Sequence, residues 1–148
     1  MTAVRVAGYA ALFDRADAGR DTIRPGAFSR TLAERAGPLP LYWQHRPEQR
    51  IGWVERVSED ARGLRVIAAL DNPAGRAAAM LRRRAVSGLS FGFRARRFRH
   101  SPDGRELLDV ELFEVSLVTH PLQHGARVHF FFDPQTPGAA HPGRLASA

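Results

Sequence analysis

The chain has 148 residues, enough for one domain with its own hydrophobic core. It contains no cysteine, which excludes a disulfide scaffold, a cysteine-ligated metal site and a cysteine nucleophile. The net charge is +7 and all 22 basic residues are arginine; this composition favours polyanionic partners, or it reflects a GC-rich genome. No apolar run approaches the ~18 residues of a membrane span, and no signal peptide is evident, so we expect an intracellular protein without membrane contact.

The first half of the chain predicts strands around one short helix. Residues 14–24 are polar and rich in aspartate, as expected for a loop. Phe28 and Leu32 have the i, i+4 spacing of an amphipathic helix, which we place over residues 27–36. The apolar alternation changes phase after Trp53, which indicates a β-bulge. The strands predicted in this half are residues 4–13, 39–43, 51–57 and 64–70, the last two joined by a turn.

The second half predicts one more helix and a longer hairpin. Asn72 and Pro73 have the character of an N-cap followed by the first helical position, and the helix should run to Arg84. Residues 101–104 have the composition of a hairpin turn. The strands predicted here are residues 86–98, 106–119 and 127–132.

Together these elements predict a mainly β (α+β) fold of about seven strands. Because most connections are hairpin-like, the favoured architecture is a closed or nearly closed antiparallel β-barrel with two or more peripheral helices. Residues 1–133 should form this domain. Residues 134–148 are rich in Pro, Gly and Ala and are expected to be a flexible tail.

Three residues carry the candidate chemistry. His45 lies at a predicted strand end, where a rigid element can aim an accessible side chain, although a plain surface histidine fits as well. Ser90 lies between Gly88 and Gly92, which should leave backbone uncovered for a substrate carbonyl and an oxyanion hole; glycines at a barrel bend are the simpler alternative. Glu114 lies in an apolar strand, where a carboxylate is costly unless it is paired, for example with an imidazole or an outward-facing arginine.

Other residues offer weaker alternatives. Glu111 has the same ambiguity as Glu114 with the opposite strand parity. His120, His124 and His129 could suggest a metal site, but no cysteine or neighbouring carboxylate completes a ligand set, and we expect none. The sequence has no phosphate-binding glycine motif, so no cofactor is expected.

A row of arginines on the strand 86–98 and just beyond it suggests a different class of function. Aromatic residues alternate with these cations, as on a nucleic-acid-binding face, although a half-buried strand shows the same alternation. The arginines are Arg94, Arg96, Arg97 and Arg99, and the aromatic residues are Phe91, Phe93 and Phe98.

Taken in order, several short segments resemble the prohead maturation proteases of tailed phages, over roughly residues 4 to 130. The two most specific are Pro-Gly-Ala-Phe at residues 25–28 and Glu-Val-Ser-Leu-Val-Thr at residues 114–119. The others are residues 8–13, Trp43-Gln-His45 followed by Ile51-Gly52, Gly63-Leu64 and Ser87-Gly-Leu-Ser-Phe-Gly-Phe93. Gene transfer agents carry similar proteases, and the short, Arg- and Ala-rich chain fits that version.

The resemblance implies a serine protease with a β-barrel flanked by helices, similar to the herpesvirus assembly protease. It implies His45 as general base, Ser90 as nucleophile and Glu114 as the third member, with Glu111 or a histidine left open for that third role. The implied partners are the major capsid protein and its scaffold segment, cleaved inside the immature shell in the bacterial cytoplasm; self-cleavage and self-association stay open. A catalytically inactive assembly protein of the same fold is the main alternative, and a nucleic-acid-binding module is a weaker one.

Overall fold

The computed structural model describes residues 3–134 and 143–144, over which the chain forms nine strands and two helices. The strands are β1 (Val4–Leu12), β2 (Asp21–Ile23), β3 (Leu39–Trp43), β4 (Arg46–Glu59), β5 (Gly63–Leu70), β6 (Gly88–Ser101), β7 (Gly104–Val118), β8 (Val128–Phe132) and β9 (Gly143–Arg144). The helices are α1 (Ser29–Glu34) and α2 (Arg76–Arg82). Neither helix is long and apolar enough to cross a bilayer, and no other helix occurs in the described residues.

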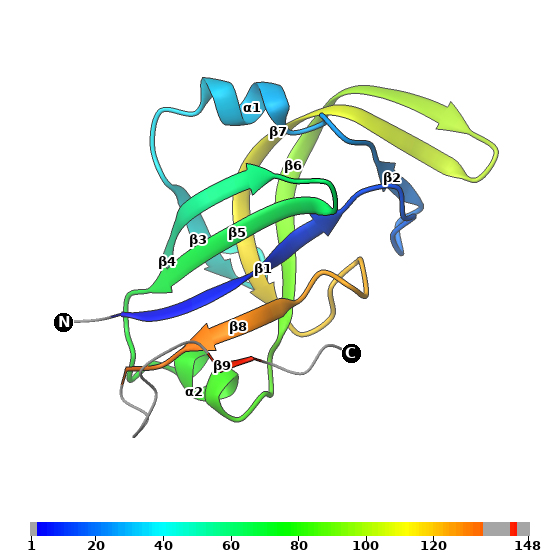
Figure 1. Ribbon diagram of the computed structural model, residues 1–148. Helices are drawn as coiled ribbons and strands as arrows, with labels where there is room; N and C mark the ends of the chain where they lie inside the picture. The colour runs from blue at the N-terminus through cyan, green and yellow to red at the C-terminus, as the bar shows by residue number, and fades with distance from the viewer. Residues whose placement is uncertain (1–2, 135–142, 145–148) are drawn as a thin grey trace.

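All the strands belong to one curled sheet, with the two helices at its opposite ends (Figure 1). The order is β2-β7-β3-β4-β5-β1-β8-β9, and β6 pairs with the other side of β7. The start of β6 also reaches the segment before β8, because Leu89 N donates to Ala126 O and Val128 N donates to Ser87 O, both at 2.8 Å. These bonds connect β6, beside one end of the strand order, to the segment that leads into β8 near the other end. The predicted mainly β fold with a nearly closed barrel and peripheral helices is therefore confirmed.

The prediction that the sheet is antiparallel throughout is wrong at two pairings. Strands β2 and β3 both run parallel to β7. The sequence predicted residues 14–24 as a loop, yet Asp21–Ile23 within it is a strand. Pairing with β7 and the contact of the Asp21 carboxylate with Arg105 (2.9 Å) hold this short segment. Such a strand depends on a distant partner rather than on its own alternation.

Most predicted strands are found, with shifted ends. Strand β4 begins at Arg46 rather than Ile51. The sequence did not predict this earlier start, because the first residues of the strand are polar and exposed and show no apolar alternation. The bulge predicted in this strand is present, as a register shift between Val54 and Arg56. Strand β6 runs on to Ser101, so the β6–β7 hairpin projects beyond the body of the sheet (Figure 1).

Both helices are shorter than predicted. The backbone of Ala27 and Phe28 forms turns ahead of α1, so the helix starts at Ser29 and not at residue 27. Asn72 does not cap α2. Its side chain accepts a hydrogen bond from Ala74 N (3.0 Å) in a separate turn, and α2 starts only after Gly75. An Asn-Pro pair favours either a cap or a turn, and here it forms the turn.

Apolar side chains from the concave face of the sheet meet those of α1 and its preceding turn in one core. Phe28 is completely buried there, and its ring lies 5.2 Å from that of Phe91 and 6.3 Å from that of Phe13. The backbone of the same turn bonds to β7, since Val110 N donates to Ala27 O at 3.0 Å. Phe28 therefore packs the turn against β6 and against Phe13, the residue that follows β1.

The predicted division between domain and tail at residue 133 stays a prediction. Most of the predicted tail, residues 134–148, lies outside the described residues. Within it, Gly143 and Arg144 form β9, which pairs antiparallel with β8. The flexibility predicted for the tail therefore stays a prediction.

The packing of Phe28 predicts a large loss of stability when its ring is removed. Phe28→Ala should lower the free energy of unfolding by about 3–5 kcal/mol, because it deletes a fully buried aromatic side chain and leaves a cavity. Denaturant unfolding followed by circular dichroism measures this change. Phe113→Ala is the matched control, since the Phe113 side chain is 48% exposed and its loss should cost well under 1 kcal/mol. Equal losses in the two variants would contradict the assigned role of Phe28.

Candidate active site

His45 occupies a tight turn between β3 and β4. Gln44 and His45 both adopt left-handed backbone conformations, with φ of 52° and 62°. Such values are uncommon away from glycine and persist only where the surroundings hold them. Here β7 does so, because Gln44 N donates to Leu117 O at 3.0 Å and His45 N donates to Ser116 Oγ at 3.1 Å. The turn therefore presents His45 in a fixed place beside β7.

The side chain of Gln44 strengthens this attachment. Its Nε2 donates to Thr119 Oγ1 at 3.2 Å, and its Oε1 accepts from Thr119 N at 3.3 Å. The two bonds join the turn to the residue that follows β7, in addition to the backbone bonds. The turn that carries the imidazole is thus held by β7 and by Thr119, the residue that follows it.

Glu114 is the partner of the His45 ring. Its Oε1 lies 2.5 Å from His45 Nδ1, and its side chain is almost fully buried in the site. Because a carboxylate only accepts hydrogen bonds, Nδ1 carries the proton in this contact. In the neutral ring, Nε2 is then left as the free, basic nitrogen. The arrangement is that of an acid–imidazole pair ready to accept a proton at Nε2.

The pKa of His45 is raised above its ordinary value. The hydrogen bond with Glu114 is the main cause, and the attraction between imidazolium and carboxylate adds to it. Partial burial of the ring acts in the opposite direction, because it disfavours the charged form. The contact with Glu114 prevails over burial.

Ser90 lies on β6, directly opposite Ser116 of β7. Residues paired across neighbouring strands project to the same face, as do residues two apart along one strand. Ser90, Ser116 and Glu114 therefore share one face of the sheet, beside the turn that carries His45. Ser90 is almost fully buried, and its hydroxyl forms no hydrogen bond with any side chain in the described part of the chain.

The two glycines around Ser90 have a different role from the one predicted. A Cβ at Gly88 would lie 2.8 Å from Pro121 Cδ, and a Cβ at Gly92 would overlap Glu114 Oε1 and lie 2.9 Å from its Cδ. The space beside both glycines is therefore already filled, and not open to a substrate as expected. Gly92 is needed because the Glu114 carboxylate lies over it.

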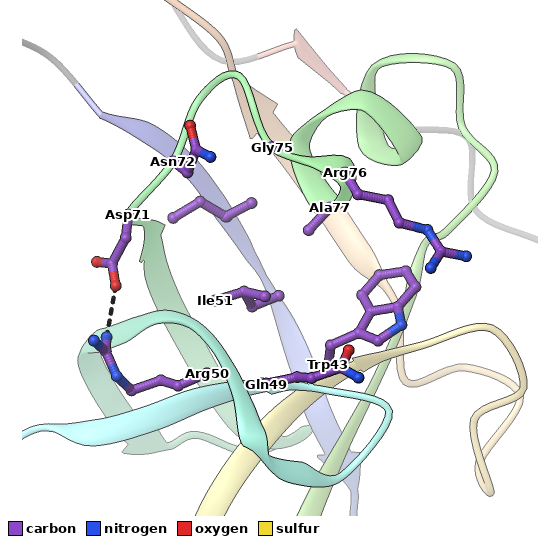
Figure 2. Close-up of a pocket in the computed structure, with 10 residues that line it drawn as sticks. Trp43, Gln49, Arg50, Ile51, Asp71, Asn72, Gly75, Arg76 and Ala77 are labelled. Atoms are coloured by element: carbon purple, nitrogen blue, oxygen red, sulfur yellow. Dashed lines mark hydrogen bonds and ion pairs between the residues drawn. The ribbon is translucent and has the colours of Figure 1, made fainter.

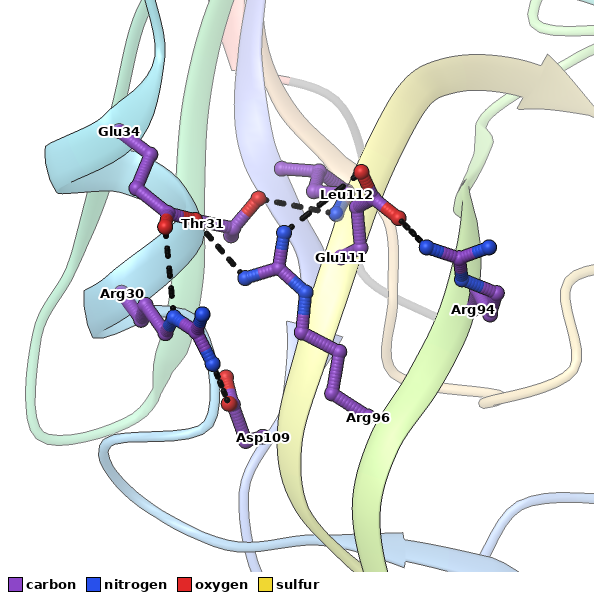
Figure 3. A network of polar contacts seen from close by, with 8 residues as sticks. All are labelled: Arg30, Thr31, Glu34, Arg94, Arg96, Asp109, Glu111 and Leu112. Atoms are coloured by element: carbon purple, nitrogen blue, oxygen red, sulfur yellow. Dashed lines mark hydrogen bonds and ion pairs between the residues drawn. The ribbon is translucent and has the colours of Figure 1, made fainter.

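Glu111, the alternative to Glu114, belongs to a separate network that joins α1 to the β6–β7 hairpin (Figure 3). Its carboxylate pairs with Arg94 at 2.7 Å and with Arg96 at 3.5 Å, and Arg96 also pairs with Glu34 of α1 at 2.9 Å. These contacts hold Glu111 away from the imidazole. They also pair Arg94 and Arg96, two of the four arginines of the predicted nucleic-acid face, with carboxylates.

The remaining histidines of the described segments do not gather into a metal site. No three His, Asp or Glu side chains in the described segments are arranged to hold a metal ion. The ring centroid of His129 lies 5.7 Å from that of Tyr9, on the strand pair β1–β8.

Ser87 accepts a hydrogen bond from Arg127 Nη1 at 3.1 Å, so it is engaged in a structural contact, unlike Ser90.

A pocket of about 280 Å³ is lined in part by Trp43, two residues before His45 (Figure 2). The sequence did not predict it. Apolar side chains of Trp43, Ile51 and Ala77 line it, and the Arg50–Asp71 ion pair (2.6 Å) closes one side. Its walls come from two separate segments, residues 43–51 and 70–77, so no local pattern could reveal it.

The fold is similar to that of a herpesvirus protease and that of a phage capsid assembly protease. The protease of varicella-zoster virus superposes with a TM-score of 0.63 at 18% identity, covering 94% of this chain and 68% of that protein. The capsid assembly protease of bacteriophage T4 superposes with a TM-score of 0.63 at 12% identity, covering 78% of this chain and 81% of that protein. At these identities the likeness establishes the fold alone.

Sequence similarity gives the family. The model of the caudovirus prohead serine protease family matches residues 2–135, and the chain belongs to this family. It is also 30% identical over 128 residues to the prohead protease of Enterobacteria phage HK97. That match covers 82% of this chain but 57% of the relative, so the chain spans little more than half the length of that protein. The predicted family resemblance is thus confirmed.

The packing of Glu114 over Gly92 predicts a specific effect of a methyl group there. Gly92→Ala should push the carboxylate away from the imidazole and lower the pKa of His45 toward its ordinary value of about 6.5. An NMR titration of the histidine ring resonances measures this pKa. Gly37→Ala is the control, because nothing lies within 4 Å of a Cβ at that position. An unchanged His45 pKa in Gly92→Ala would show that the carboxylate is not held over Gly92.

Proposed function

We propose that this chain is a serine endopeptidase that cleaves the scaffold segment of the major capsid protein during prohead maturation. It would act inside the assembling prohead in the cytoplasm of the bacterial host. The family and the relative in phage HK97 support the process and the capsid partner. The observation that carries the chemistry is the His45–Glu114 contact of 2.5 Å on the sheet face that also bears Ser90.

In this mechanism Ser90 is the nucleophile and His45 the general base. His45 Nε2 takes the hydroxyl proton as Ser90 Oγ attacks the carbonyl carbon of the scissile peptide. The C–N bond then breaks, and the imidazolium gives the proton to the leaving amine, which leaves an acyl group on Ser90. Water, activated by the same imidazole, hydrolyses that ester and restores the hydroxyl. Glu114 holds the tautomer and stabilises the imidazolium in both steps.

The combination of Glu114, His45 and the free hydroxyl of Ser90 favours this proposal over the main alternative, an inactive assembly protein. A fold retained only for assembly has no need of a buried carboxylate aimed at an imidazole, since such a group is costly to bury. Here the carboxylate, the imidazole and an unengaged serine occur together on adjacent elements.

The high positive charge of the chain would favour association with an acidic scaffold segment.

The central test is processing of the capsid protein in co-expression. With the wild-type chain, intact-mass analysis of the major capsid protein should show one defined N-terminal truncation. Ser90→Ala should abolish it, because the nucleophile is gone, while circular dichroism shows an unchanged fold. Ser87→Ala is the matched control, since its hydroxyl bonds Arg127, and should process normally. Truncation by Ser90→Ala would remove Ser90 as the nucleophile, and no truncation by the wild type within complete shells would favour the assembly protein.

The raised pKa of His45 sets the direction of the pH dependence. Only the neutral imidazole accepts a proton, so the cleavage rate should rise with pH through a midpoint above the ordinary value of about 6.5. Glu114→Gln should lower that midpoint and slow cleavage strongly; the comparable change costs about 10⁴-fold in a well-studied protease triad. Rates of capsid-protein truncation across the neutral range measure both effects. Unchanged rates with reduced thermal stability would make Glu114 a structural residue instead.

A further inference from the structure

We propose that Ser116 is a positioning residue that holds both His45 and Glu114 in their working geometry; this inference rests on the proposed function. Ser116 lies on β7 between the other parts of the site, paired with Tyr42 of β3 on one side and with Ser90 of β6 on the other. The strand that carries Glu114 therefore also carries the residue that links it to the histidine turn.

The Ser116 hydroxyl makes two bonds that fix its orientation. Its Oγ donates to Glu114 Oε2 at 2.6 Å and accepts from His45 N at 3.1 Å. The direction follows from chemistry, because a carboxylate only accepts and a backbone N–H only donates. One hydroxyl thus fixes the far oxygen of the carboxylate and the backbone of the histidine, while Glu114 Oε1 contacts the ring itself.

Burial makes both bonds consequential. Ser116 is completely buried, and Glu114 is 6% exposed. Water cannot readily replace the hydroxyl there, so its loss would leave a carboxylate oxygen and a backbone N–H without partners. The His45 backbone is also in the left-handed region, and its bond to Ser116 is one of those that keep it there.

Packing alone does not require a hydroxyl at this place. The residues on either side, Val115, Leu117 and Val118, are all apolar and buried. Val118 lies on the same face of β7 as Ser116, two residues further along, so an apolar side chain is compatible with this face, and what the Ser116 hydroxyl adds is its two hydrogen bonds. The specific role therefore lies in the site and not in the core.

The test compares Ser116→Ala, Ser116→Val and Ser116→Thr. Valine and threonine have the same shape and differ in the hydroxyl, so the pair separates the hydrogen bonds from the effect of added bulk. The probe is 4-nitrophenyl acetate, an activated ester that needs no peptide recognition, with the rate of Ser90→Ala subtracted as background. NMR titration of the His45 ring is the second readout, and it does not depend on catalysis.

The alanine and valine variants should lose about tenfold or more in kcat with KM unchanged, the scale of one hydrogen bond to a charged group. Their His45 pKa should fall toward its ordinary value. Threonine should restore both. Thr31→Ala is the matched control, because Thr31 is also a buried hydroxyl that accepts a backbone N–H, from Leu112 at 3.1 Å, but lies on α1 (Figure 3). It should lower thermal stability and leave kcat and the His45 pKa unchanged.

The outcomes separate this inference from the proposed function. Wild-type esterase activity no greater than that of Ser90→Ala would contradict the proposed function, and the His45 titration would still decide the role of Ser116. Folded alanine and valine variants with the wild-type kcat and His45 pKa would overturn the positioning role. Equal losses of kcat in folded Ser116→Val and Ser116→Thr would also overturn the positioning role. Thermal unfolding identifies a variant that does not fold, and the alanine variant, which only removes an atom, then decides alone.

Discussion

The contact between His45 and Glu114 is the interaction on which the rest of the site depends. Burying a carboxylate is energetically unfavourable unless it is paired and hydrogen-bonded. Three features of the fold accommodate Glu114: the imidazole of His45, the Ser116 hydroxyl, and the space left by Gly92. Each comes from a different strand or turn. The curled sheet is therefore what allows the pair to exist, because it brings β6, β7 and the β3–β4 turn side by side.

Strand β7 is the central element of this arrangement. It pairs with β6 on one side and, in parallel, with β2 and β3 on the other. The parallel pairing with β3 sets the histidine turn beside Ser116, so the geometry of the site follows from an unusual feature of the sheet. The β6–β7 hairpin is joined to α1 by the network around Glu111, whose β6 and β7 residues lie near the middle of the two strands (Figure 3).

The sequence was sufficient for the class of fold, for most strands and for the family, because apolar alternation and short motifs are local. It could not decide whether Glu114 or Glu111 faces the imidazole. That choice depends on how β3, which leads into the histidine turn, pairs with β7, where Tyr42 lies opposite Ser116, and no single strand reveals such a pairing. The sequence offered Ser116 only as a fallback nucleophile and not as a positioning residue, since a serine within an apolar run does not reveal its hydrogen-bond partners. The parallel strands and the Trp43 pocket likewise depend on segments far apart in the chain.

The central claim is that this sheet face is a serine-protease active site, and reaction with a fluorophosphonate tests it most directly. Such a reagent modifies a serine hydroxyl only where a neighbouring base activates it, with loss of fluoride. Peptide mapping of the treated, folded protein should find one adduct, on Ser90, and none in His45→Ala. Absence of an adduct on the folded wild-type chain, or an adduct on a different serine, would contradict the account.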